Sequence, residues 1–175
     1  MTKSTIKYSI SINYNLQFNN CWRKTIMRTP KQDLGDKGVK LVAKHCRCPQ
    51  CKPAKRTLRA LPNNFKCADI ICDFCGYLAQ VKAKTVPDVN KLTDVVLGAA
   101  WAPQKERMDA GIFFPLFLVQ IAGKRYSIFY LSADLQPKDL FAPRKPLSAK
   151  ARRAGWQGFL YDLKKVQQGA VVRLR

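Results

Sequence analysis

Acidic side chains are scarce in this 175-residue chain, which has 11 Asp and Glu residues against 32 Lys and Arg residues. Glu106 is its one glutamate, so few carboxylates are available for metal binding or catalysis. The formal net charge of +21 strongly repels itself unless the protein meets a polyanion. An incidental basic surface would carry more interspersed Asp and Glu. The charge balance therefore favours a nucleic acid as the partner.

Long apolar runs are also missing from the sequence. No stretch approaches the roughly 18 residues of a membrane-spanning helix, and residues 1–18 alternate polar and apolar side chains instead of forming the continuous apolar run of a signal peptide. The chain has neither an internal repeat nor a low-complexity linker, and 47% hydrophobic residues are enough for one core. We expect a single globular domain located in the cytoplasm.

The cysteines point to a metal site. Seven is an odd number, and in a reducing compartment paired C-x2-C knuckles favour metal over disulfides. Four of them form the pattern C-x2-C-x20-C-x2-C, namely Cys48, Cys51, Cys72 and Cys75. Each knuckle turns two thiolates toward one tetrahedral ion, which predicts a structural zinc ribbon over residues 48–75. His45 and Cys46 are alternative ligands, but the spacing favours Cys48. Cys21 and Cys67 are interpreted as small buried side chains.

The patterning of the chain predicts a strand-rich α+β fold. Alternating or apolar segments predict strands at 6–18, 65–71, 77–85, the part of 112–121 after Pro115, 126–131, 158–163 and 170–174. The first of these is a structural strand, an extra edge strand or a dimer contact. A helix is expected from an N-cap at Asp88 to near Pro103, and a short one at Pro137. Residues 28–40 are interpreted as a loop. This order predicts a mixed sheet covered by one main helix, with the zinc knuckle inserted.

Asp69, Gln80 and Lys82 form a candidate catalytic set. Residues two apart on a strand face the same side, so Gln80 and Lys82 project together, and a hairpin at the second knuckle brings Asp69 across from them. Mg2+ prefers oxygen ligands, which the carboxylate of Asp69 and the amide of Gln80 supply. Lys82 would then orient or deprotonate a water, or stabilise transition-state charge. The competing interpretation is a chance Gln-x-Lys on an ordinary strand.

A long segment near the end of the chain carries a resemblance to a known family. Residues 144–158, RKPLSAKARRAGWQG, with Asp162-Leu163 after them and Pro137-Lys138 before them, closely resemble a segment of the DpnI and Dam-replacing family of restriction endonucleases. The knuckles match as well, with C-P-x-C at 48–51 and A-D-x-x-C-x-x-C at 68–75. An acid or amide, a hydrophobic residue and a lysine follow in the family, as they do here at residues 80–82.

The resemblance implies a PD-(D/E)xK nuclease fold with an embedded zinc site. The catalytic residues would be Asp69, Gln80 and Lys82, with structural Zn2+ and catalytic Mg2+. Gln80 stands where the best-known member has Glu, which predicts weaker metal affinity. The similarity fades before about residue 41. We therefore expect an N-terminal extension over 1–40, a catalytic domain over 41–175, and no winged-helix domain like that of the DpnI enzyme.

The sequence thus predicts a Mg2+-dependent type II restriction endonuclease of double-stranded DNA, directed to adenine-methylated GATC or a related site. In the resembled family the 144–158 segment belongs to the DNA-facing side, which assigns DNA contacts to Lys145, Arg152, Arg153 and Trp156. A core role for Trp156 is the alternative there. The rival function is a zinc-ribbon nucleic-acid-binding protein without catalysis. Cutting both strands requires a dimer or two sequential visits.

Overall fold

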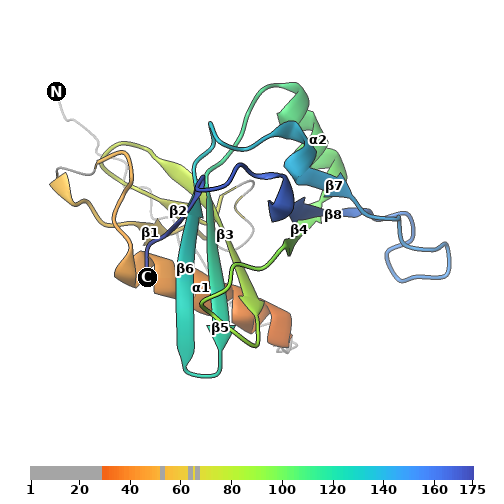
Figure 1. Ribbon diagram of the computed structural model, residues 1–175. Helices are drawn as coiled ribbons and strands as arrows, with labels where there is room; N and C mark the ends of the chain where they lie inside the picture. Colours follow the sequence, from red (N-terminus) through yellow and green to blue (C-terminus); the bar gives the residue numbers. More distant parts are fainter. Residues whose placement is uncertain (1–28, 52–53, 63–64, 66–67) are drawn as a thin grey trace, which may run out of the picture.

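A computed structural model describes residues 29–51, 54–62, 65 and 68–175. The predicted strand at 6–18, Cys21 and Cys67 lie outside the described residues. Figure 1 shows the elements, which are α1 (Pro30–His45), β1 (Arg59–Ala60), β2 (Ile70–Ile71), β3 (Leu78–Thr85), β4 (Val95–Ala100), α2 (Trp101–Asp109), β5 (Leu116–Ala122), β6 (Arg125–Leu131), the 3-10 turn η2 (Lys138–Leu140), β7 (Phe141–Pro143), β8 (Gly158–Asp162), the 3-10 turn η3 (Leu163–Lys165) and β9 (Val171–Arg173).

A six-stranded sheet forms the centre of the molecule, in the order β1-β2-β3-β5-β6-β9. β3 and β5 pair in parallel and the other neighbours are antiparallel. Six of the seven residues of β5 are buried, because alternate side chains enter two separate cores. Phe117 and Val119 face the core under α1, whereas Leu116 and Leu118 face the core shared with β8. Such a doubly covered strand is typical of parallel pairing.

The helix α1 occupies the segment that the sequence analysis assigned to a loop, and that prediction was wrong. Thr29 and Gln32 form a capping box, with Pro30 in the first turn. Gly38 permits close packing on the sheet, since a Cβ there would lie 2.8 Å from the Cβ of Ala83. The glycines and charged residues of this segment therefore serve a helix that covers one face of the sheet (Figure 1).

The main helix expected from Asp88 to Pro103 is also absent. Residues 86–94 are irregular, β4 follows, and α2 begins at Trp101 with Pro103 in its first turn. Side chains of the sheet form hydrogen bonds with the backbone of the irregular segment. Gln120 donates to Lys91 O and accepts from Thr93 N. Lys84 Nζ likewise donates to Thr93 Oγ1 and to Val95 O. These bonds satisfy the segment without helical pairing.

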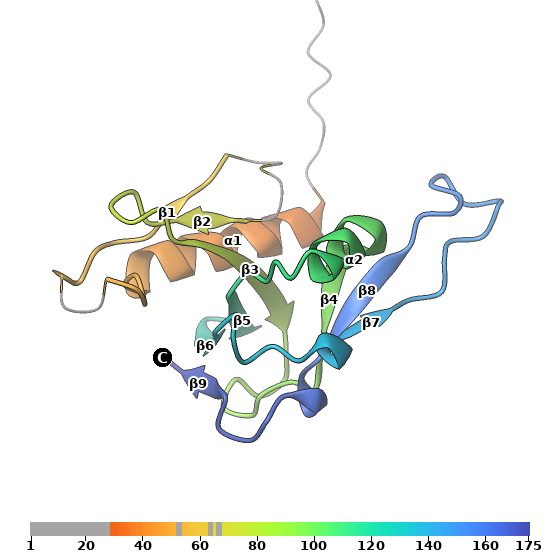
Figure 2. The ribbon, with the colours of Figure 1, turned by 90° about the horizontal axis from the view of Figure 1, so that it is seen from above.

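A second sheet joins three strands in the order β4-β8-β7 and packs with α2 beside the first (Figures 1 and 2). Between β7 and β8 the chain forms a hairpin over 144–157, which Figure 2 shows projecting away from the body. Backbone bonds from Leu147 N to Trp156 O (2.9 Å) and from Arg144 N to Gly158 O (2.9 Å) hold its two arms together.

The structure confirms the predicted α+β class with a mixed sheet. It also confirms the strands near 77–85, 126–131, 158–163 and 170–174, the strand after Pro115 and the short helix at Pro137. The strand expected at 65–71 shrinks to Ile70–Ile71 among the described residues, and one main helix becomes two. No helix in the described part of the chain is both long and apolar enough to cross a membrane.

Candidate functional site

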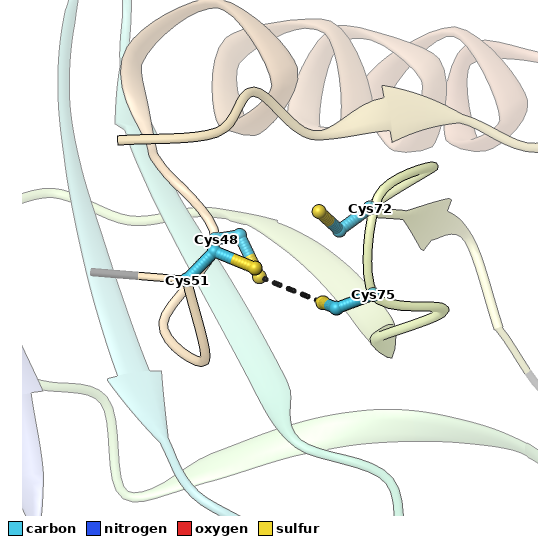
Figure 3. A group of neighbouring side chains, drawn as sticks. All are labelled: Cys48, Cys51, Cys72 and Cys75. Carbon is cyan, nitrogen blue, oxygen red and sulfur yellow. Dashed lines mark hydrogen bonds between the residues drawn. The ribbon is translucent and has the colours of Figure 1, made fainter. Parts of the chain in front are cut away.

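The four cysteines of the predicted zinc ribbon converge on one point. Their Sγ atoms all lie within 4.8 Å of one another, and the Sγ atoms of Cys48 and Cys75 are 3.6 Å apart. Figure 3 shows Cys48 and Cys51 facing Cys72 and Cys75 from two separate turns. The second turn closes through the bond from Cys72 N to Tyr77 O (2.8 Å), with Gly76 at φ 72°. Four thiols around one point are the donor set of a structural zinc site.

The electrostatics of this cysteine cluster favour a bound cation. Burial raises the pKa of Cys48, and the Cys75 thiol together with burial raises the pKa of Cys51 to about 12. Burial also acts on Cys72, but the N–H groups of Cys75 and Phe74 bring its pKa down to about 7. The thiolate forms of Cys48 and Cys51 are therefore disfavoured when no cation lies among them. A divalent cation would offset the repulsion between the thiolates, so the residues present fit Zn2+.

The two alternative ligands lie outside the cysteine cluster. The ring of His45 contacts Tyr126 and Arg175 instead. Cys46 is buried, and burial raises its pKa to about 11, which keeps it a neutral thiol. The structure therefore agrees with the spacing argument that favoured Cys48.

Asp69 is fixed at the start of β2, beside β3, by three hydrogen bonds. Its N–H donates to Ala79 O (2.9 Å), and its carbonyl accepts from Leu61 N (2.9 Å). Its Oδ2 accepts from Val81 N (2.7 Å), on the side of β3 that β2 leaves unpaired. The carboxylate therefore takes the place that a neighbouring strand would fill. Cys72 follows only three residues later, so the cysteine cluster and Asp69 share one short segment.

Lys82 and Gln80 lie on the same face of β3, and Val81 lies in the core on the opposite face, under α1. Lys82 Nζ is 4.0 Å from Asp69 Oδ2, and the lysine side chain is 21% exposed. Gln80 turns toward β8, where its Oε1 accepts a hydrogen bond from the hydroxyl of Tyr161. The structure thus brings Asp69 and Lys82 into an ion pair and places Gln80 next to them on the strand.

Tyr161 is a site neighbour that the sequence analysis missed. Only 2% of the residue is exposed, yet its hydroxyl meets Gln80. Burial raises the pKa of this hydroxyl, the Asp69 carboxylate raises it further, and Arg107 lowers it. The phenol therefore remains protonated where it meets the amide of Gln80. The sequence held one signal for this role. Tyr161 lies two residues after Phe159 on a predicted strand, so it faces the core with Phe159, and a buried tyrosine hydroxyl requires a hydrogen-bond partner.

A cavity of about 700 Å³ opens beside Asp69, between α1, β3 and the described residues 60–62, 65, 68 and 69. Its lining includes Lys31, Asp36, Lys40, Pro62, Asp69 and Lys82. Gln80 does not line it, because its side chain faces β8. The cavity therefore leads from a lysine-bearing face of α1 to the Asp69–Lys82 pair.

The predicted DNA-contacting residues lie on the hairpin 144–157. This hairpin has five basic and no acidic side chains, and Lys145, Arg152 and Arg153 are exposed. The Arg153 guanidinium stacks 4.5 Å above the Trp156 ring. Trp156 is partly exposed and belongs to neither buried cluster, so the core role considered for it is not supported.

The described residues therefore define an α+β protein in which a cluster of four cysteines that could hold a metal ion adjoins an Asp–Lys pair at the start of β2, beside β3. A family model described as DpnI: Dam-replacing family matches residues 16–174, nearly the whole chain. The chain belongs to this family, which confirms the resemblance drawn from the sequence, and the match begins at residue 16 and not near residue 41 as expected. The family is one of restriction endonucleases for methylated DNA, which places the chain in a class of DNA-binding proteins.

Proposed function

We propose that the protein is a Mg2+-dependent type II restriction endonuclease that hydrolyses double-stranded DNA at adenine-methylated GATC or a related site. The observation that carries the proposal is the Asp69–Lys82 pair, with Nζ and Oδ2 4.0 Å apart on the unpaired edge of β3. Gln80 is the third member, which gives the order expected of a PD-(D/E)xK site. Family membership supplies the DNA substrate class.

The chemistry of the donor set fits Mg2+. Asp69 offers a carboxylate and Gln80 an amide oxygen, and both are hard oxygen ligands. The carbonyl of Val81 points to the same strand edge as its N–H, which Asp69 already occupies, and would complete the protein share of the ligands. A bound Mg2+ would polarise the scissile phosphate and lower the pKa of the attacking water.

Lys82 has the position of a group that stabilises charge at the reacting phosphate. Its ammonium faces the Asp69 carboxylate from a mostly buried position, so it meets little competing solvent. An ammonium there orients the attacking water and offsets the negative charge that builds up as the bond to the leaving oxygen breaks. The lysines that line the cavity on α1 extend this positive potential toward the DNA backbone.

The hairpin 144–157 would bind the DNA duplex. Lys145, Arg152 and Arg153 neutralise phosphates, and Trp156 presents a partly exposed ring for stacking or wedging against bases. Because α1 crosses residue 40 and packs on β3, we place it within the catalytic domain. Reduced thiols at the cysteine cluster suit a cytoplasmic enzyme.

Replacing Trp156 tests the hairpin assignment. We expect Trp156→Ala to weaken DNA binding by about tenfold, because stacking by one aromatic residue contributes roughly 1–3 kcal/mol. Gel retardation in EDTA measures the affinity, and thermal unfolding measures the stability. Lys124→Ala, an exposed substitution in the β5–β6 turn, is the control outside the proposed DNA contacts. If Trp156→Ala lowered the thermal stability along with the DNA affinity, the ring would instead be assigned to the core.

The proposed activity is tested with plasmid from Dam-positive and Dam-negative hosts, incubated with Mg2+ or EDTA. We expect cutting of the methylated plasmid alone, and only with Mg2+. Sequencing the ends of the cut plasmid then gives the recognition site and the cut position. Retardation of both plasmids without cutting would support the rival function, a non-catalytic zinc-ribbon protein in which Gln80 marks a decayed site.

A further inference from the structure

The hydrogen bond between Tyr161 and Gln80 joins β8 of the small sheet to β3 of the large one. The tyrosine is 2% exposed, and its hydroxyl donates to Gln80 Oε1 across a separation of 81 residues. A buried Tyr hydroxyl usually finds a partner, but this partner is a residue of the candidate metal site. No other side chain is recorded as a hydrogen-bond partner of Gln80 among the described residues, so this bond sets the rotation of its amide.

An amide differs from a carboxylate in having two unlike ends. The carbonyl oxygen attracts a cation, whereas the NH2 group repels it, and rotation of the amide by half a turn exchanges them. The two oxygens of a carboxylate are equivalent, so its rotation has no such consequence. A site that uses Gln80 in place of Glu therefore needs a group that selects the oxygen.

We propose that Tyr161 is a positioning residue that selects the oxygen end of Gln80 for the divalent cation. This proposal rests on the proposed function. The hydroxyl occupies one lone pair of Oε1 and leaves the second free for a cation. Gln80 shares its face of β3 with Lys82, whose Nζ lies 4.0 Å from Asp69 Oδ2.

Four proteins test the proposal: the natural chain, Tyr161→Phe, Gln80→Glu and the double variant. The first readout is the dissociation constant for Mn2+. It is obtained by titrating the zinc-loaded protein with Mn2+ and measuring the free Mn2+ by electron paramagnetic resonance. The second is the Mg2+ concentration that gives half-maximal plasmid cleavage. Tyr161→Phe keeps the ring in the core, and Gln80 is partly exposed to water, so this variant will fold.

We expect Tyr161→Phe to weaken Mn2+ binding about three- to tenfold when residue 80 is Gln, the effect of losing one hydrogen bond. In the Gln80→Glu background, Tyr161→Phe should change the Mn2+ dissociation constant less than about twofold, because the two oxygens of a carboxylate are equivalent. Gln80→Glu alone should lower the Mg2+ requirement. Tyr130→Phe removes a partly buried hydroxyl that bonds to the hydroxyl of Tyr77 at 3.1 Å, and it should leave Mn2+ binding unchanged.

Three outcomes would overturn the proposal. Equal effects of Tyr161→Phe in both backgrounds would assign Tyr161 to the structure of the core alone. Tighter Mn2+ binding in Tyr161→Phe would show that the hydroxyl competes with the cation. Unchanged binding in Tyr161→Phe would exclude any role in metal binding. Loss of the proposed function is distinguished from these, because the natural chain would then bind Mn2+ no more tightly than Asp69→Asn.

Discussion

Replacing Asp69 with Asn will reduce DNA cleavage on the order of 1,000-fold while leaving the protein folded and bound to DNA. The substituted amide still offers an oxygen to Val81 N, which the natural carboxylate accepts at 2.7 Å, so the strand edge remains closed. What disappears is the negative charge beside Lys82 and the one carboxylate proposed to hold Mg2+. Losses of this size are typical when a group that stabilises transition-state charge is removed.

The rate of plasmid cleavage at saturating Mg2+ measures this effect, with gel retardation as the readout for DNA binding. Asp73→Asn is the matched control, because Asp73 lies four residues away and pairs with Arg59 at 3.1 Å on the exposed side of the knuckle. We expect the control to cleave at nearly the natural rate. If Asp69→Asn retained most of its activity, another group would have to hold the metal.

Loss of zinc will unfold the neighbourhood of Asp69. Structural zinc contributes on the order of 10 kcal/mol of apparent binding energy, which is comparable to the whole stability of a domain. Cys72 is three residues from Asp69 and directly follows β2, so disorder at the cysteine cluster would release the carboxylate from the edge of β3. Cys72→Ser should therefore abolish both zinc retention and cleavage.

Metal analysis and hydrogen exchange measure this result. The natural chain should contain one zinc per molecule, and the amides of Asp69 and Val81 should lose protection in Cys72→Ser. Cys46→Ala is the control, since Cys46 is buried next to the first knuckle but lies outside the four-cysteine cluster. It should keep its zinc. A fully active natural protein without zinc would contradict the assignment.

The site was predictable where local spacing determines it. The C-x2-C pairs fix which thiols meet, and alternation on β3 puts Gln80 and Lys82 on one face. Pro115 likewise marked where β5 begins, because proline cannot donate to a neighbouring strand.

The errors came from residues whose conformation is determined by distant partners. Gly38 suggested a loop, but it lies in a helix, where the close approach of Ala83 leaves no room for a larger side chain. The stripe after Asp88 suggested a helix, but Gln120 binds the backbone of Lys91 and Thr93 in an irregular conformation. Tyr161 could not be assigned to the site from spacing, since the bond to Gln80 spans 81 residues.

The proposed activity depends on Asp69 and Gln80 holding a divalent cation next to Lys82. A crystal of the zinc-loaded protein, soaked in Mn2+ and measured for anomalous scattering, tests it most directly. We predict a zinc peak among the four cysteines and a manganese peak about 2.2 Å from the Asp69 carboxylate, within reach of Gln80 Oε1. Manganese bound elsewhere, with no density at Asp69, would contradict the account.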